Sequence, residues 1–362
     1  MRNITDVAVI GAGTMGGGIA ISTAIGGVNV TLLDTAKEAV EKARARVRDY
    51  LDRQVQKKRM TEKQALGALG RLRFSNDIRD ASDAQLVIEA VFEDLDVKRN
   101  VFVALESVVS PTTTLATNTS ALKVSDIGTD LRHPERLCGI HYFSPAEINP
   151  VVEVIKSVTT APETVANVLP FLRRCGKSPI ECLDRTGFAL NRFFCPYTNE
   201  AARCLDDGLG DEDQIDAVAK KVFGVSAGPF FVMNIVKPRI NLAAVRSLVS
   251  LGPFYEPAAS LVTCGEADEA WDLSHGNTPL SQENCALIAE RLQGAIFFAV
   301  LEEISEGVAA PDAIDRGARE AFTFAKGPVE MMKEMGPGEV ARLINQVKYG
   351  DATLTRALFR KV

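Results

Sequence analysis

A histidine and a glutamate twelve positions apart form the first candidate for chemistry in this sequence. His141 is one of only three histidines among 362 residues, and Glu153 lies in the apolar run 151–155. A half-buried histidine whose imidazole is oriented by a carboxylate is suited to act as a general base near neutral pH. The alternative is a core histidine beside a strand whose Glu153 faces water, since most such neighbours are structural. Spacing alone leaves both interpretations open.

A glycine-rich turn near the start of the chain indicates a dinucleotide site. A short buried strand leads into the turn and then a helix, with Gly11, Gly13 and Gly16 in the pattern GxGxxG. The first glycine allows the tight turn, the second lets a pyrophosphate approach the backbone, and the third lets helix and strand pack closely. The amides at the start of the helix, at Thr14 and Met15, would then hold the phosphates.

An acidic residue at the end of the second strand predicts which dinucleotide binds. The strand pattern at 28–33 ends in Asp34, whose carboxylate would accept hydrogen bonds from the adenosine ribose hydroxyls. The same charge would repel a 2′-phosphate, and the neighbouring Thr35 supplies no compensating arginine. NAD is therefore the predicted cofactor rather than NADP. A GxGxxG turn also occurs for structural reasons, but its position between strand and helix favours the nucleotide site.

The composition limits the class of protein. The charged fraction of 24% and the hydrophobic fraction of 46% are those of a soluble globular chain, long enough for two or three domains. A net charge of −6 argues against nucleic-acid binding. The seven cysteines show no metal-ligand spacing, so we predict free thiols and no metal site. No apolar run reaches membrane-spanning length and no signal peptide precedes the first strand, which predicts a cytoplasmic protein without membrane contacts.

Strands and helices alternate from the N-terminus to about residue 184. This alternation is typical of a doubly wound sheet, in which ligands gather at the carboxyl ends of the strands. Ser120 follows one predicted strand and is a site candidate, although helix capping is an equally ordinary role for serine. Further strands are predicted at 84–91, 113–117, 136–140, 151–155 and 178–183, and amphipathic helices at about 36–60 and 162–174.

The predicted helix at 36–60 ends in a basic triplet that includes Lys57. One interpretation is a solvated helix end, where positive charge suits the helix dipole. The other is a contact for the phosphates of a large anionic substrate. The sequence pattern itself favours the solvated end.

Beyond residue 184 the pattern becomes helical and contains an internal repeat. Nine identities at a fixed offset of 99 residues indicate two copies of one helical module. We therefore predict three domains, at 1–184, 185–285 and 286–362, with a looser connector at about 255–281. The first set is Arg192, Gly208, Asp213, Ile215, Asp216, Ala219, Phe223, Gly228 and Pro229, and its counterparts are Arg291, Gly307, Asp312, Ile314, Asp315, Ala318, Phe322, Gly327 and Pro328.

The two copies differ at one position of interest. Asn191 in the first copy corresponds to Glu290 in the second. If the helix at about 188–205 borders a ligand cleft, only the first copy presents a neutral amide to it. The ordinary alternative is that Asn191 is a helix-start residue.

Together these motifs resemble the L-3-hydroxyacyl-CoA dehydrogenase family over nearly the whole chain. The resemblance implies a Rossmann-type α/β domain followed by an all-α region of two repeated helical modules. It implies an NAD cofactor, an acyl-CoA substrate and the reversible oxidation of an L-3-hydroxyacyl-CoA to the 3-oxoacyl-CoA, as in fatty-acid oxidation. The segments that carry it are GAGTMGGGIA, IEAVFEDLDVK, ATNTS, GIHYFSP, VVEVI and TGFALNRFFCPYTNEA.

The resemblance also implies roles for individual residues. His141 would accept the 3-hydroxyl proton while hydride passes to the nicotinamide, and Glu153 would hold the imidazole in the required tautomer. Ser120 and Asn191 would hydrogen-bond the substrate oxygen. Lys57 would meet the CoA phosphates, which reverses the preference for a solvated helix end. The cofactor contacts implied in addition are Glu93, Lys98, Ser120 and Ser144.

Among the departures from the family pattern, two concern possible ligand contacts. Ser144 stands where relatives commonly have asparagine, and its hydroxyl can still donate a hydrogen bond. The segment FVMNIVKP at 231–238 stands where relatives tend to have an acidic residue and a glycine, which predicts an altered acyl-chain pocket.

Large members of the family carry two helical modules in tandem, whereas short members have one and pair through it as homodimers. We expect the second module at 286–362 to take the place of a partner's helical domain, giving a monomer with an internal pseudo-dimer, with a homodimer as the alternative. The competing functions are an NAD-dependent dehydrogenase of a hydroxy acid not linked to CoA, and a non-enzymatic relative that retains the fold.

Overall fold

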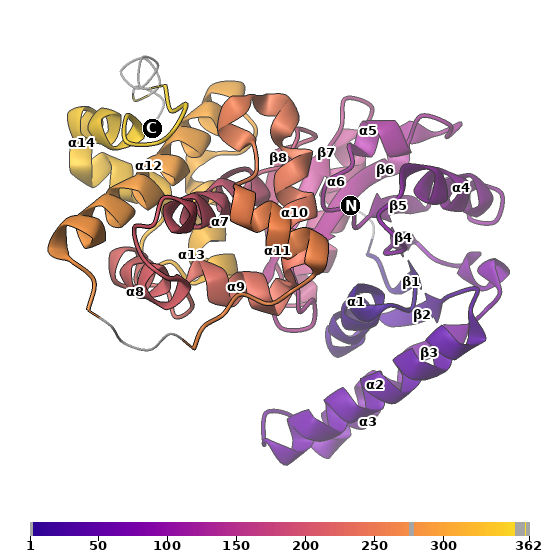
Figure 1. Cartoon of the computed structure of the whole chain (residues 1–362). Helices are drawn as coiled ribbons and strands as arrows, with labels where there is room; N and C mark the ends of the chain where they lie inside the picture. Colours follow the sequence, from indigo (N-terminus) through magenta and orange to yellow (C-terminus); the bar gives the residue numbers. More distant parts are fainter. Residues whose placement is uncertain (1–2, 275–278, 352–358, 360–362) are drawn as a thin grey trace. The chain divides into compact units, whose positions relative to one another are not determined.

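The computed structural model describes residues 3–274, 279–351 and 359, shown in Figure 1. It divides into two compact units, Met1–Asp184 and Arg185–Val362. The first is built on a sheet and the second on helices.

The first unit is built on one eight-stranded sheet. The strand order is β3-β2-β1-β4-β5-β6-β7-β8, and every neighbouring pair is parallel except β6 and β7. The central strands β1, β4 and β5 are almost entirely buried, as expected where helices cover both faces of such a sheet. The strands are β1 Asp6–Ile10, β2 Asn29–Leu33, β3 Leu72–Ser75, β4 Leu86–Glu89, β5 Thr114–Thr117, β6 Leu137–Tyr142, β7 Val151–Lys156 and β8 Ser178–Leu183.

Strands β1 to β6 run in one direction, so their carboxyl ends lie on one edge of the sheet, whereas β7 and β8 run in the opposite direction. The helices of this unit are α1 Thr14–Ile25, α2 Lys37–Gln56, α3 Glu62–Gly70, α4 Leu95–Glu106, α5 Val124–Ile127 and α6 Pro162–Arg174. The predicted α/β architecture is confirmed, with two local differences. The single helix expected at 36–60 ends at Gln56, and the separate α3 and the short β3 follow it.

A capping box explains why α3 forms as a separate helix. The Thr61 side chain accepts from the Gln64 amide, and the Gln64 side chain accepts from the Thr61 amide. This reciprocal pairing satisfies two donors that a helix start otherwise leaves unpaired.

The second unit consists of two sets of helices that correspond at an offset of 99 residues. α13 begins and ends 99 residues after α8, and α14 begins 99 residues after α9. We call α7–α11 the first repeat and α12–α14 the second. The helices are α7 Leu190–Asp206, α8 Glu212–Phe223, α9 Pro229–Val236, α10 Pro238–Ser247, α11 Ala259–Ala267, α12 Gln282–Glu306, α13 Pro311–Phe322 and α14 Pro328–Ile344.

The segment expected to be a looser connector, 255–281, contains the regular helix α11, which packs against α7 and α10. Residues 275–278 of that segment lie outside the described residues. The predicted start of the second module at residue 286 falls within the first turns of α12, which begins at Gln282.

α12 is the one helix among the described residues that is long and apolar enough to span a membrane. This was not anticipated from the sequence. Of its most apolar window, 61% is buried inside the unit, and α12 packs against α7, α8 and α14. Those contacts are what the central helix of a folded bundle makes.

Candidate active site

His141 and Glu153 face each other across the antiparallel pair of strands. His141 lies near the carboxyl end of β6, Glu153 lies near the start of β7, and the two are direct register partners. Side chains of register partners project from the same face of the sheet. His141 Nδ1 lies 2.7 Å from Glu153 Oε2, within a buried hydrogen bond. The sequence left open whether Glu153 faces water, and the structure places it in the core.

Burial and hydrogen bonding together fix the orientation of this histidine. His141 is 4% exposed and Glu153 is fully buried. The carboxylate accepts the proton of Nδ1, which fixes the tautomer in which Nε2 carries the basic lone pair. A positive imidazolium, once formed, would be stabilised by the adjacent carboxylate. The Phe143 ring lies 4.6 Å from the imidazole, centre to centre, and adds an apolar wall.

The glycine-rich turn has the shape that a dinucleotide pyrophosphate requires. A Cβ on Gly16 would lie 1.8 Å from the Gly11 carbonyl oxygen, so only glycine permits this packing of α1 on β1. Gly11 has a φ of 105°, and a Cβ there would meet the Ala90 carbonyl at 2.5 Å. A Cβ on Gly13 would meet nothing within 4 Å, so Gly13 borders open space at the start of α1. Phosphate groups bind at helix starts of this kind.

Asp34 follows β2, next to the glycine-rich turn. Its carboxylate accepts hydrogen bonds from the Ala12 amide at 2.8 Å and the Ala36 amide at 3.0 Å. These bonds fix the acidic group beside the turn, as expected for a ribose-binding position.

Arg46, on α2, was not identified from the sequence and also supports the turn. Its guanidinium donates to the carbonyl oxygens of Gly13 at 2.8 Å and Ala12 at 3.1 Å. No sequence pattern indicates the contact between Arg46 and the turn, because this contact depends on how α2 packs.

A buried ion-pair network lies at the carboxyl ends of β4 and β5. Lys98 is 1% exposed, and its Nζ lies 2.7 Å from Glu89 Oε1 and 3.3 Å from Glu93 Oε2. The Thr117 hydroxyl donates to the second oxygen of Glu89 at 2.7 Å. Glu89 was not identified from the sequence, although a glutamate at the end of the apolar run LVIE is a signal for a paired buried charge.

Glu93 links this network to the segment that carries Ser120. It accepts hydrogen bonds from the amides of Ser120 at 2.8 Å and Ala121 at 3.0 Å, and from the Thr119 hydroxyl. Burial raises the pKa of the Glu93 carboxyl, but the Lys98 charge and these hydrogen bonds outweigh burial and lower the pKa below its usual value. Glu93 is therefore an anion that holds the Ser120 segment in place.

Ser120 is exposed, just after β5, and does not cap a helix, since α5 begins at Val124.

The Asn118 side chain accepts a hydrogen bond from the Tyr142 amide at 2.9 Å. That bond ties the end of β5 to the residue after His141. Asn118 was not singled out from the sequence.

The other predicted site residues are distributed along the chain. Ser144 is exposed on the loop between β6 and β7, and Lys57 is exposed directly after α2. Asn191 belongs to the second unit, in the first turn of α7. Among the described residues, no group of histidine, cysteine and carboxylate side chains is arranged to hold a metal ion.

Two family models cover most of the chain. The model "3-hydroxyacyl-CoA dehydrogenase, NAD binding domain" matches residues 6–185. The model "3-hydroxyacyl-CoA dehydrogenase, C-terminal domain" matches twice, at residues 187–269 and 287–361. The chain belongs to the 3-hydroxyacyl-CoA dehydrogenase family. The resemblance stated from the motifs is thereby confirmed, and so are the NAD cofactor and the assignment as an NAD-dependent oxidoreductase.

Individual relatives show how far this similarity extends. A probable 3-hydroxyacyl-CoA dehydrogenase of Caenorhabditis elegans is 36% identical over 242 residues, which is 65% of this chain and 78% of that protein. The 3-hydroxyadipyl-CoA dehydrogenase of Escherichia coli is 36% identical over 248 residues, 68% of this chain but 52% of that protein. The chain thus spans about half the length of that second relative.

Among solved structures, the 3-hydroxybutyryl-CoA dehydrogenase of Escherichia coli K12 superposes with a TM-score of 0.91 over 99% of both chains. Its sequence is 23% identical, so the likeness shows a shared fold. A smaller Mycobacterium tuberculosis structure, FadB2, is 31% identical and superposes with a TM-score of 0.72 over 78% of this chain and 97% of that chain.

Proposed function

We propose that this protein oxidises an L-3-hydroxyacyl-CoA to the 3-oxoacyl-CoA, with His141 as the general base and Glu153 as the residue that orients it. The observation that carries the proposal is the buried bond of 2.7 Å between His141 Nδ1 and Glu153 Oε2. It lies in the unit that contains the glycine-rich turn. A base and a dinucleotide cradle are the two elements that alcohol oxidation requires.

Oxidation of a secondary alcohol removes a hydride from carbon and a proton from oxygen. NAD, when bound, supplies the hydride acceptor. His141 Nε2 accepts the hydroxyl proton, because the Glu153 carboxylate already engages Nδ1. Glu153 then neutralises the imidazolium, and in the reverse direction His141 returns the proton to the substrate oxygen.

We further propose that the network around Glu93 positions the cofactor and the substrate oxygen. Lys98, whose Nζ lies 3.3 Å from Glu93 Oε2, would contribute to the nicotinamide side of the cofactor site by holding that carboxylate. Glu93 in turn fixes the Ser120 amide, so that the Ser120 hydroxyl can hydrogen-bond the substrate. Ser144, exposed after His141, would donate to the cofactor.

We also propose which residues bind the adenosine and pyrophosphate of NAD, the CoA phosphates and the substrate oxygen. Asp34 would accept from the adenosine ribose, with Gly11, Gly13, Thr14, Met15 and Gly16 forming the pyrophosphate cradle. Lys57 would pair with the CoA phosphates, since an exposed ammonium suits a mobile anionic group. Asn191 would donate its amide to the substrate oxygen.

The test is NADH formation with L-3-hydroxybutyryl-CoA beside free L-3-hydroxybutyrate. We expect turnover of the thioester and less than about one hundredth of that rate with the acid, because remote binding energy from CoA supports catalysis. Activity with the free acid and none with the thioester would favour the alternative of a hydroxy-acid dehydrogenase. Absence of NADH with either compound would favour a non-enzymatic relative.

We also propose that the chain is a monomer whose two repeats form an internal pseudo-dimer. Arg192 of the first repeat pairs with Glu306 of the second, and Arg291 of the second repeat pairs with Asp207 of the first. Both the arginines and the carboxylates correspond at an offset of 99 residues. Reciprocal pairs of this kind are a property of two-fold interfaces.

Light scattering of the active enzyme tests this arrangement. We expect a mass near 39.1 kDa at the concentration of the assay. An active species that is always a dimer, built through residues 286–362, would contradict the pseudo-dimer.

Two further proposals concern the location of the protein in the cell and the kind of partner it binds. All seven cysteines are free thiols, which is the form kept in a reducing compartment and supports a cytoplasmic location. The net charge of −6 supports a small-molecule substrate over a nucleic-acid partner.

A further inference from the structure

Asn191 and Phe194 share one accessible face of α7. Between Gly187 and Ala202 every residue is buried except these two, which are partly exposed. Residues three apart on a helix are neighbours on the same face. A substrate oxygen held by the Asn191 amide would therefore be within one helical turn of the Phe194 ring.

Phe194 forms one wall of an apolar pocket of about 160 Å³ within the second unit. The Phe322 ring stacks on Phe194 with centroids 3.9 Å apart, and the Tyr197 ring lies 5.6 Å from Phe194. Phe324 and the partly exposed Ala227 also line the pocket. Four aromatic rings around one opening make a surface that favours an apolar group over water.

The size of the pocket limits what it can hold. An engineered apolar cavity of about 150 Å³ accommodates benzene. A volume of about 160 Å³ therefore fits one ring, or a few carbon atoms of an alkyl chain.

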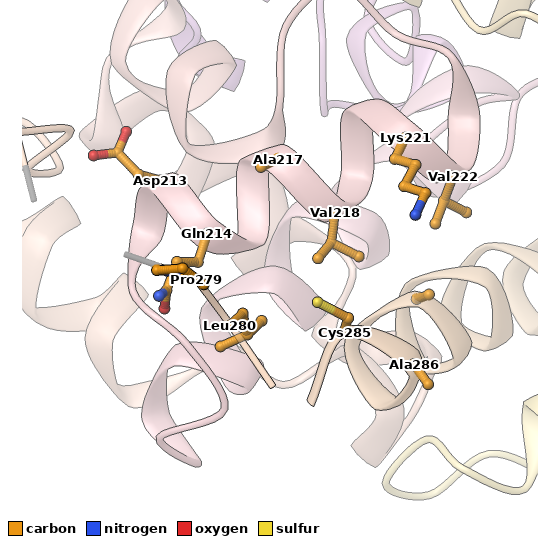
Figure 2. Close-up of a pocket in the computed structure, with 11 residues that line it drawn as sticks. Asp213, Gln214, Ala217, Val218, Lys221, Val222, Pro279, Leu280, Cys285 and Ala286 are labelled. Atoms are coloured by element: carbon orange, nitrogen blue, oxygen red, sulfur yellow. The ribbon is translucent and has the colours of Figure 1, made fainter. Parts of the chain in front are cut away.

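A larger pocket of about 590 Å³ lies between α8 and the start of α12, and it is the competing candidate. Figure 2 shows Ala217 and Val218 of α8 on one side and Leu280 and Cys285 on the other. Ala289 lines this pocket, and the next residue, Glu290, is the counterpart of Asn191 and pairs with Arg342 at 2.8 Å. A carboxylate at that position would repel a substrate oxygen that carries developing negative charge.

We propose that the pocket lined by Phe194, Tyr197, Phe322 and Phe324 receives the distal, apolar part of the acyl group. The proposal rests on the function proposed above and adds a substrate class to it: esters of medium chain length or with a terminal phenyl ring. The first repeat thus contributes the amide and most of the pocket, and the second repeat contributes its Phe322 and Phe324 wall.

The test uses a series of L-3-hydroxyacyl-CoA esters with four, six and eight carbons and one with a terminal phenyl group. For the natural enzyme we expect kcat/KM to rise about fourfold for each additional methylene that is buried. Ala227→Phe fills the pocket from its partly exposed rim. It should lower kcat/KM for the eight-carbon and phenyl esters about tenfold or more, and change that for the four-carbon ester by less than about twofold.

Ala217→Phe is the matched control, because it makes the same change at an exposed position in the larger pocket. It should leave the chain-length profile unchanged. Phe322→Ala enlarges the proposed pocket and should move the preference to longer esters, which provides a second readout if Ala227→Phe folds poorly.

The outcomes separate this proposal from the one on which it rests. A length profile that changes in Ala217→Phe, or stays the same in both Ala227→Phe and Phe322→Ala, would overturn the pocket assignment while the dehydrogenase activity stands. No activity of the natural enzyme with any ester would overturn both.

Discussion

Arg291 of the second repeat and Arg192 of the first occupy corresponding positions, but their surroundings differ. Arg291 pairs with the fully buried Glu200 at 2.7 Å as well as with Asp207 at 2.6 Å. Arg192 pairs with Glu306, whose side chain is 37% exposed. The position equivalent to Glu200 in the second repeat is Ala299. One half of the pseudo-symmetric interface therefore contains an additional buried charge.

The two repeats also share a helix-capping device. Asp216 accepts from the amides of Phe230 and Phe231 at the start of α9, and Asp315 accepts from the equivalent amides at the start of α14. The residues that hold the fold together are thus retained in both copies, whereas Asn191 has become Glu290. Within one chain, the residues that stabilise the fold are the same in both repeats, whereas the residue at the proposed ligand position differs.

The largest effect on stability is expected from Arg291→Met. It leaves Glu200 buried with Arg203, at 3.2 Å, as its remaining partner. Removing one member of a buried ion pair costs about 3–5 kcal/mol. Urea unfolding followed by circular dichroism measures the loss.

Arg192→Met is the matched variant for this comparison. Arg192 is itself buried, but Glu306 can turn to solvent once the arginine is removed, so we expect a smaller loss than in Arg291→Met. Equal losses in the two variants would mean that the additional buried carboxylate does not distinguish the two halves.

The proposed separation of roles predicts unequal effects on catalysis. Asn191→Leu should lower kcat/KM about a hundredfold, because loss of one donor to a reacting oxygen costs about 10²–10³ in rate. Glu290→Gln should leave kcat/KM within about twofold, since Glu290 pairs with Arg342 on the surface. NADH formation with a four-carbon ester measures both. A similar loss in each variant would place the second repeat in the catalytic machinery.

The capping carboxylates predict a smaller, pH-dependent difference. Burial raises the pKa of Asp216 to about 6, against the opposing hydrogen bonds of two amides, and burial also raises the pKa of Asp315. The folded state therefore binds the Asp216 proton more tightly than the unfolded state, and stability falls as the pH rises from about 4 to 6. The full effect is at most about 3 kcal/mol.

Unfolding free energies at pH 4.5 and pH 7 check this difference for the natural protein, Asp216→Asn and Asp315→Asn. The natural protein should lose more stability across this interval than Asp216→Asn does. Asp315→Asn should remove a smaller part of the dependence. An unchanged pH dependence in Asp216→Asn would show that this carboxyl titrates normally in the folded state.

Several features of both units could be predicted from local sequence. The glycine-rich turn requires particular residues at fixed spacing, and Asp34 follows at a distance set by one helix and one strand. The internal repeat was visible because both copies keep Arg192, Asp216 and their counterparts. Weakly patterned elements were missed, although the Thr61 capping box offered a signal for α3.

Other features depend on tertiary packing, and local sequence did not specify which residues would meet. The pairing of His141 with Glu153 required the antiparallel register of β6 and β7, which the sequence did not specify. The bond between Lys98 and Glu89 joins a helix to a neighbouring strand, and the contact of Arg46 with the turn depends on the position of α2.

The most direct test of the account compares His141→Gln and Glu153→Gln with the natural enzyme in NADH formation from L-3-hydroxybutyryl-CoA, with NAD affinity measured separately. Removing a general base costs about 10²–10⁴ in rate. We expect His141→Gln to be nearly inactive and Glu153→Gln to be severely impaired, each with an NAD dissociation constant within about twofold of the natural value. Normal turnover by His141→Gln would contradict it.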